Sequence, residues 1–330
     1  MSFELGQTIG EYEFVDIVRS SRSSVAYKVR NTLAQRFELL RVLRRLQDDP
    51  EKRDRFAREI KVLARIQHPN IVTFFHATQL AGELVLTTEL VEGSTLAERM
   101  EVGRVPLGEA LDSMIKVLDA LGYAHSQEVM HRDVTPENII LTPEGDVKLT
   151  GFGLAKKQSD PALTQAGTML GSLDYISPEQ VKGLPTIDAR TDIYAVGVIL
   201  YELATGKKPF PGESQFEVMF AHVNAEPARP DQANPEVSAE LSAAILKAMA
   251  KEPADRFQTA AEFRRALESV RRPQTAPAGA EAAPSPVLPP PVPAASEPAP
   301  VFSATSMLWA GVLMAVLLAV LIAILIVRRG

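Results

Sequence analysis

The chain has 330 residues, of which 46% are hydrophobic, and a formal net charge of −6 at pH 7. This length and composition are sufficient for one large folded domain with a substantial core and further segments. The acidic balance argues against broad, non-specific nucleic-acid binding. The absence of cysteine excludes disulfides, thiolate metal sites and a cysteine nucleophile.

The stretch before residue 91 predicts a small unit that is mainly β-stranded. Residues 11 to 31 should form a β-hairpin, and F-E-L-L-R-V-L, residues 37 to 43, should form a strand. Residues 49 to 66 show helical periodicity, and residues 84 to 90 predict a further strand. We therefore expect a sheet accompanied by one helix.

Helices and one long loop dominate the prediction for the following part. Residues 111 to 126 form a strongly periodic apolar pattern. Residues 191 to 210, T-D-I-Y-A-V-G-V-I-L-Y-E-L-A-T-G-K-K-P-F, predict a buried helix. Between them lies M-H-R-D-V-T-P-E-N-I-I-L-T-P-E-G-D-V-K-L-T-G-F-G, residues 130 to 153, which predicts a loop followed by a β-hairpin.

The composition changes after residue 272. Ten of the 31 residues from 273 to 303 are proline, which predicts a semi-rigid, polyproline-biased linker rather than a proline-motif ligand. Residues 307 to 327 are 21 uncharged, mainly aliphatic residues, and this length predicts a transmembrane helix. A buried core helix is disfavoured because the segment has no polar face.

The motifs resemble, in order, those of the bacterial eukaryotic-like serine/threonine protein kinases. H-R-D at residues 131 to 133 and Asn138 match the catalytic-loop pattern H-R-D-x-x-x-x-N. S-P-E at residues 177 to 179 stands for A-P-E, and residues 191 to 210 match the central helix of that fold. The resemblance covers residues 8 to 272, or four fifths of the chain.

This resemblance implies an α+β, bilobal protein-kinase-like fold. The small β-rich lobe would span residues 8 to about 90, and the large helical lobe residues 91 to about 272. The linker of residues 273 to 303 would then join the domain to the transmembrane helix of residues 307 to 327.

The resemblance also assigns chemical roles. Asp133 would accept the proton of the substrate hydroxyl, and Asn138 would be a metal ligand. Thr88 would be the gatekeeper, after which the backbone of Glu89 and Val91 would face the adenine of ATP. These positions form the candidate nucleotide and catalytic site.

Other matching positions would hold the fold together. Arg41, in place of the usual strand lysine, is expected to form an ion pair with Glu59 of the helix that follows. Asp192 is expected to bond the backbone of the catalytic loop, and Arg256 to pair with Glu179.

The departures from the family pattern fall on groups that would touch phosphate or magnesium. Three of them replace glycines of the loop G-x-G-x-x-G, where backbone amides approach the phosphates closely. The others replace the strand lysine, the lysine after H-R-D and the aspartate of D-F-G. The replacing residues are Arg19, Ser21, Ser24, Arg41, Thr135 and Gly151.

Removing one preorganised electrostatic group costs on the order of 10²–10³ in rate, and two or more losses suggest about 10⁴ or more. The sequence therefore favours a pseudokinase that acts as a signalling scaffold or binding partner of an active kinase or its substrates, with ATP binding possible without efficient Mg²⁺ coordination. The alternative is an active ATP-dependent kinase with non-standard phosphate and metal handling, because Asp133 and Asn138 are retained.

A transporter subunit is disfavoured, because one span without ionisable residues offers no pathway.

Residues 154 to 179 would form the activation segment. Thr164, Thr168 and Ser172 are candidate phosphorylation sites there, and Arg132 would pair with a phosphate on one of them. The alternative is that they are ordinary loop hydroxyls.

The expected topology is single-pass, with the kinase-like domain in the cytoplasm. Arg328 and Arg329 favour a cytoplasmic C-terminus by charge counting. That orientation would require the large domain to cross the membrane, and residues 1 to 10 lack the pattern of a signal peptide. The domain size is therefore given more weight than the two arginines.

Overall fold

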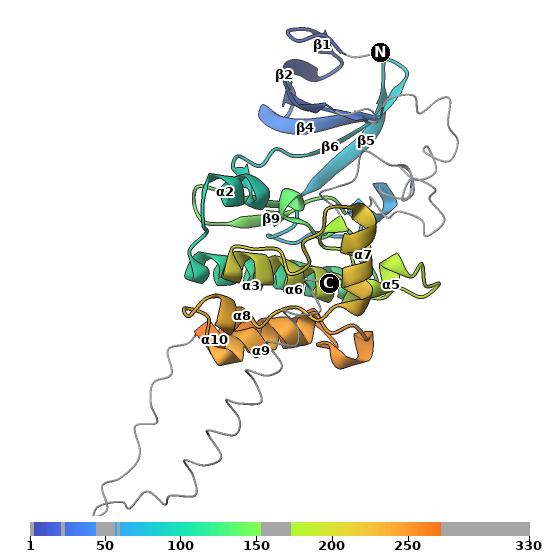
Figure 1. Cartoon of the computed structure of the whole chain (residues 1–330). Helices are drawn as coiled ribbons and strands as arrows, with labels where there is room; N and C mark the ends of the chain where they lie inside the picture. The colour runs from blue at the N-terminus through green and yellow to red at the C-terminus, as the bar shows by residue number, and fades with distance from the viewer. Residues whose placement is uncertain (1–2, 21–23, 44–56, 58–59, 153–172, 272–330) are drawn as a thin grey trace, which may run out of the picture. The chain divides into compact units, whose positions relative to one another are not determined.

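The computed structural model describes residues 3–20, 24–43, 57, 60–152 and 173–271 (Figure 1). All of these residues belong to one compact unit, Met1–Gln274, and the remainder of the chain, Thr275–Gly330, lies outside the described residues. The predicted linker and transmembrane helix therefore lie outside the described residues as well. Within the described ranges, no helix is long and apolar enough to cross a membrane.

Six strands form an antiparallel sheet in the order β1-β2-β3-β4-β6-β5 (Figure 1). The strands are β1 (Thr8–Ile9), β2 (Tyr12–Ser20), β3 (Ser24–Asn31), β4 (Arg36–Leu43), β5 (Phe74–Leu80) and β6 (Glu83–Glu89). The predicted hairpin, the strand of residues 37 to 43 and the strand of residues 84 to 90 are confirmed as β2–β3, β4 and β6. Of the predicted helix, residue 57 and residues 60 to 63 are helical, and most of the rest lies outside the described residues.

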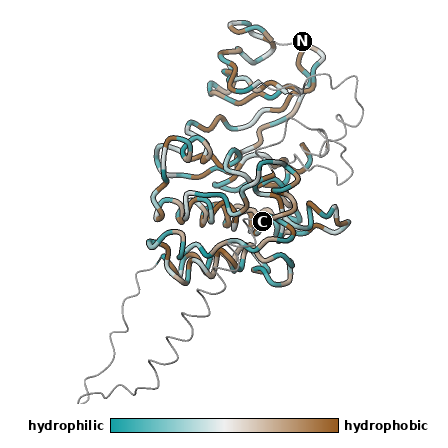
Figure 2. The backbone as a smooth tube through the Cα atoms, viewed as in Figure 1, coloured by the Kyte–Doolittle hydropathy of each residue, from teal (hydrophilic) through white to brown (hydrophobic). Residues whose placement is uncertain are grey.

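Strand β4 has one face in the core of the small lobe. Leu40 and Val42 are 0% and 3% exposed and pack in a cluster with Tyr12 and Phe14 of β2. Because side chains alternate along a strand, Arg41 points to the opposite face. Figure 2 shows hydrophobic and hydrophilic stretches interspersed along the strands of the small lobe.

The large lobe is mainly helical and carries a small three-stranded sheet in the order β7-β8-β9. The strands are β7 (Ser94–Thr95), β8 (Ile139–Leu141) and β9 (Val147–Leu149). The α-helices are α2 (Leu96–Val102), α3 (Leu107–Ser126), α5 (Pro178–Val181), α6 (Arg190–Thr205), α7 (Gln215–Asn224), α8 (Pro230–Ala233), α9 (Ala239–Ala248) and α10 (Ala260–Arg271). Two 3₁₀ turns are η1 (Pro136–Asn138) and η3 (Pro253–Asp255).

Helix α6 lies at the centre of the large-lobe core, and nearly all of its residues are buried. Gly197 allows a close approach of α9, because a Cβ at this position would lie 2.8 Å from the Cβ of Ala248. The predicted helix of residues 191 to 210 is too long at its end. The helix stops at Thr205 because Gly206 adopts a left-handed conformation with φ 71° and bonds back to Glu202.

Backbone hydrogen bonds tie the segment before β5 to the hairpin of the large lobe. Ile71 forms a parallel bridge with Leu149, and the Leu149 N–H donates to the Asn70 carbonyl at 2.8 Å. The Asn70 side chain donates to the Val147 carbonyl at 2.9 Å. These bonds place the end of β9, and hence Gly151, beside the chain that leads into β5 and β6.

Candidate functional site

The buried carboxylate of Asp192 fixes the catalytic loop by accepting hydrogen bonds from its backbone. Its two oxygens accept the backbone N–H groups of His131 at 2.9 Å and Arg132 at 2.7 Å, and His125 Nε2 lies 2.8 Å away. Burial alone would raise the pKa of Asp192, but the hydrogen bond and charge of His125 hold it below its ordinary value. The predicted bond of Asp192 to the loop backbone is confirmed.

His131 fixes the loop against the residues that follow β9. Its Nε2 donates to the Thr150 carbonyl at 2.6 Å, and its Nδ1 accepts the Asp133 N–H at 3.3 Å. Its ring packs edge-on against Phe152 at 4.6 Å between centroids. Because Nε2 donates and Nδ1 accepts, the imidazole has a structural role and a defined tautomer.

Asp133 and Asn138 lie close together in the catalytic loop. The Asn138 side-chain amide donates to the Asp133 carbonyl at 2.9 Å, and the Asn138 N–H donates to the Thr135 carbonyl at 3.0 Å. The Asn138 carbonyl in turn accepts the Thr150 N–H at 2.8 Å. Thr135 is buried at 3% exposure, so this loop residue packs inward.

Gly151 faces Asn138 across the site. Its φ of 86° lies in the left-handed region, and a Cβ added there would lie 3.0 Å from Asn138 Cγ. The position supplies no side-chain oxygen. Within the described part of the chain, no group of three or more His, Cys, Asp or Glu residues is arranged to hold a metal ion. Because Gly151 has no side chain, the residues described at this site do not fit the magnesium centre of an active kinase, which needs a carboxylate at this position beside the amide of Asn138.

Arg41 lies on the face of β4 that is turned away from the small-lobe core. It pairs in register with Ala26 of β3 and Leu86 of β6. Burial lowers the pKa of Arg41 to about 10, so its guanidinium remains charged at neutral pH. The expected partner Glu59 lies outside the described residues, and the Arg41–Glu59 ion pair stays a prediction.

The loop that should cover phosphates is only partly described. Arg19 ends a register shift in β2 and pairs with Ala26, and Ser24 begins β3. Ser21 lies outside the described residues, as do Thr164, Thr168 and Ser172 of the activation segment.

The end of β6 carries an ion pair that the sequence did not predict. Glu89, the last residue of β6, accepts from Lys148 Nζ at 2.8 Å and from the Thr73 N–H at 3.2 Å. Its own N–H donates to the Thr73 carbonyl at 2.8 Å. Thr88 is buried beside it, and Val91 follows outside regular structure. Only the alternation of V-K-L in β9 could have indicated that Lys148 points to this side.

A second buried network closes the end of the activation segment. Arg256 donates to both carboxylate oxygens of Glu179, at 2.7 and 2.8 Å, and the two side chains are almost inaccessible. Thr191 adds a hydrogen bond to Glu179 at 2.6 Å. Burial would raise the pKa of Glu179, but Arg256 and Thr191 hold it below its ordinary value. The predicted Arg256–Glu179 pair is confirmed.

Comparison with known proteins agrees with this arrangement. The family model described as "Protein kinase domain" matches residues 12–267. The chain is 37% identical over 282 residues to a probable serine/threonine-protein kinase of Streptomyces coelicolor, covering 83% of this chain and 42% of the relative. It is 37% identical over 275 residues to the serine/threonine-protein kinase PknB of Mycobacterium leprae, covering 81% and 44%.

A third relative is the serine/threonine-protein kinase PrkC of Bacillus subtilis, at 34% identity over 257 residues, covering 77% of this chain and 39% of the relative. The chain thus spans about two fifths of the length of the curated relatives it matches.

Proposed function

The chain belongs to the protein kinase family, and we propose that it is a membrane-anchored pseudokinase that works by binding other proteins. Its similarity to bacterial serine/threonine kinases gives the fold and the general class. The partners would be an active kinase or the substrates of one. Nucleotide binding without efficient Mg²⁺ coordination is compatible with this role.

The observation that carries the proposal is Gly151 opposite Asn138. Phosphoryl transfer depends mainly on positioning and on neutralising phosphate charge with metal ions. Gly151 offers no carboxylate, and Arg41 places a planar, forked cation where the family uses a point charge. With both groups altered, we expect a turnover lower by about 10⁴ or more than the roughly 1–100 s⁻¹ of active kinases.

The direct test is phosphorylation by the purified full-length chain with Mg²⁺ and radiolabelled ATP. We expect no incorporation above background into the chain itself or into a generic acceptor protein. Incorporation that disappears in Asp133→Asn would refute the proposal, because it would show that Asp133 still acts as the catalytic base.

The second candidate is an active kinase with unusual metal handling, and one observation favours it. Asp133 and Asn138 are both retained, and the Asn138 side chain donates to the Asp133 backbone carbonyl at 2.9 Å, which keeps the two residues close together. A thermal shift with ATP, measured with and without Mg²⁺, separates the candidates. A shift that requires Mg²⁺ supports the active kinase, whereas an equal shift without Mg²⁺ supports the pseudokinase. Absence of any shift counts against the active kinase.

Membrane anchoring and a cytoplasmic kinase-like domain are part of the proposal and rest on residues 307 to 327. Full-length chain should stay in the membrane fraction after alkaline washing, and a chain ending at residue 303 should be released. Protease added to sealed, inside-out vesicles should digest the kinase-like domain. Protection of that domain would reverse the proposed orientation.

A further inference from the structure

Helix α7 carries two exposed phenylalanines on its outer face. Phe216 and Phe220 are 71% and 58% exposed and lie one helical turn apart. Their rings stack at 6.3 Å between centroids with an interplanar angle of 27°. We call these two residues the aromatic pair. Two stacked, exposed phenyl rings in a folded domain indicate a binding surface more than they indicate packing.

The helix beneath the aromatic pair is firmly held. Its inner face buries Val218 and His222, and the His222 ring nitrogen Nδ1 lies 2.8 Å from the Tyr194 hydroxyl of α6. Lys251 donates to two carbonyls of the last turn, those of Ala221 at 3.3 Å and His222 at 2.9 Å. The surface is therefore preorganised, which lowers the entropic cost of binding.

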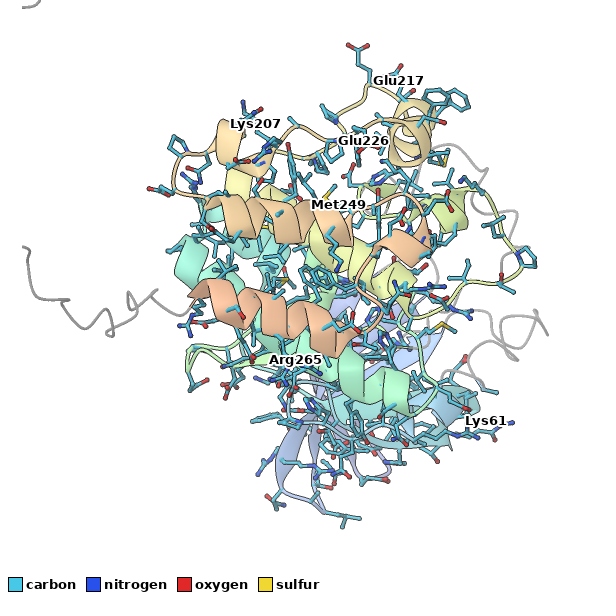
Figure 3. All side chains as sticks on the ribbon, turned by 90° about the horizontal axis from the view of Figure 1, so that it is seen from below. Lys61, Lys207, Glu217, Glu226, Met249 and Arg265 are labelled. Carbon is cyan, nitrogen blue, oxygen red and sulfur yellow. The ribbon has the colours of Figure 1, made fainter. Side chains whose placement is uncertain are left out.

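Acidic side chains lie at the N-terminal end of α7, where Glu213 precedes the helix and Glu217 lies in its first turn. Glu213 and Glu217 are both exposed, and Glu217 extends from the edge of the molecule in Figure 3. The Glu217 carboxylate accepts the Glu213 N–H at 3.0 Å, which places it at the start of the helix beside Phe216. Among the described residues, neither carboxylate forms an ion pair. The aromatic pair is thus bordered by negative charge that nothing described in the chain neutralises.

This combination selects for arginine. A guanidinium can lie flat on a phenyl ring by cation–π attraction while it donates to a carboxylate beside the ring. An ammonium group satisfies the charge but not the flat stacking, and an acidic segment would be repelled. A second copy of this chain is disfavoured, because two α7 surfaces facing each other would bring the same carboxylates together.

We propose that the aromatic pair with Glu213 and Glu217 docks a protein segment that presents arginine beside apolar side chains. This inference rests on the proposed function in that it names the surface and partner chemistry of a protein-binding pseudokinase. It needs neither nucleotide nor magnesium. An active chain would overturn the proposed function without touching this surface.

The test uses the full-length chain and short fluorescent peptides that differ only at two central positions flanked by leucines. These positions carry arginine, lysine or glutamate, and binding is followed by fluorescence anisotropy. We expect the arginine peptide to bind most tightly and the glutamate peptide not to bind. The doubly substituted chain Phe216→Ser, Phe220→Ser should bind the arginine peptide about 30-fold more weakly.

Two matched variants separate the parts of the surface. Val102→Ser removes an 86% exposed apolar side chain from α2 and should leave binding unchanged. Glu213→Gln with Glu217→Gln should remove most of the preference for arginine over glutamate and most of the salt dependence.

Three outcomes would overturn the inference: no peptide binds, the phenylalanine variants bind as the parent does, or the arginine peptide has no advantage over glutamate. Because both phenylalanines are exposed, their replacement should not change the melting temperature, and a melting curve of the double variant checks this. A photo-reactive phenylalanine analogue in place of Phe216 provides an independent check in cells. Cross-links to peptides that contain arginine support the inference, and cross-links only to α7 of another copy of the chain contradict it.

Discussion

The residues that shape the catalytic loop and the residues that would meet phosphate and metal differ sharply. Asp192 and the Glu179–Arg256 pair are buried and satisfied by several hydrogen bonds each. At the positions that would meet metal and phosphate, Gly151 offers no side chain, and Arg41 is a different cation from the family's lysine. The support of this fold therefore comes from groups outside the phosphate and metal positions, so the shape persists where the residues at those positions differ from the family pattern.

The largest expected effect comes from breaking the buried ion pair. Arg256→Ala would leave the Glu179 carboxylate without its bidentate partner in a site that water does not reach. Loss of one member of a buried pair typically costs about 3–5 kcal/mol of the free energy of unfolding. Urea denaturation of the full-length chain measures this cost.

A matched control for Arg256→Ala is Arg229→Ala, which also removes an arginine from an ion pair, here with Asp231 at the surface. We expect little change there, because solvent screens exposed pairs. Equal destabilisation by both variants would show that burial does not distinguish the Glu179–Arg256 pair from a surface pair.

The next largest effect is expected on ATP binding and phosphorylation when Gly151 and Arg41 are replaced. Gly151→Asp alone should restore little Mg²⁺-dependent ATP binding, because Arg41 would remain in place of the family's lysine. Gly151→Asp combined with Arg41→Lys should gain on the order of 10²–10³ in phosphorylation rate over the parent chain. Isothermal titration and radiolabel incorporation follow the two properties. A double variant no better than Gly151→Asp alone would show that a further defect limits the site.

A pH effect of intermediate size is expected from His222. Burial lowers the pKa of His222 from 6.5 to about 4, with a smaller contribution from Lys251. Between these two values the unfolded chain binds a proton that the folded chain does not, so stability falls as the pH falls. From about pH 7 to about pH 5 this amounts to about 2 kcal/mol.

The variant His222→Gln should lose that part of the pH dependence, as urea denaturation at both pH values would show. Below the ordinary pKa values of 4.5 for Glu179 and 3.8 for Asp192, both proteins should lose further stability, because these depressed carboxyls must then be protonated. An identical pH slope for parent and variant would rule out His222 as the source.

The smallest effect should come from the pair between Glu89 and Lys148. Lys148→Ala leaves Glu89 with its bond to the Thr73 N–H, and both side chains are partly accessible. We expect a loss of about 1 kcal/mol in the free energy of unfolding. Lys116→Ala, which removes an exposed pair with Asp146 near the same hairpin, is the control. A larger loss in the control would argue against a role of Glu89 in joining the lobes.

The fold was predictable where periodic patterns are long. The hairpin β2–β3, strand β4 and helix α3 all follow from the spacing of apolar residues. The end of α6 was not predictable in this way, because a buried apolar run continues to the turn at Gly206. Only the left-handed conformation of that glycine stops the helix.

The site was predictable where a motif has a fixed length. Asp133 and Asn138 lie in one short loop, so their proximity follows from the motif. The bond between His125 and Asp192 joins residues 67 positions apart, and that between Lys148 and Glu89 joins residues 59 apart. Such contacts depend on how whole elements pack, and a local pattern such as V-K-L indicates at most the side to which Lys148 points, not its partner.

Lys251 contacts both α7 and Arg256, and it thereby connects α7 with the Glu179–Arg256 pair at the end of the activation segment. Its ammonium group bonds the last turn of α7, while its carbonyl accepts from Arg256, the partner of Glu179. A ligand that bound α7 more tightly in one conformation of these Lys251 contacts would favour the same conformation around Glu179. By reciprocity, a modification near Glu179 would then change the affinity at α7 by the same factor.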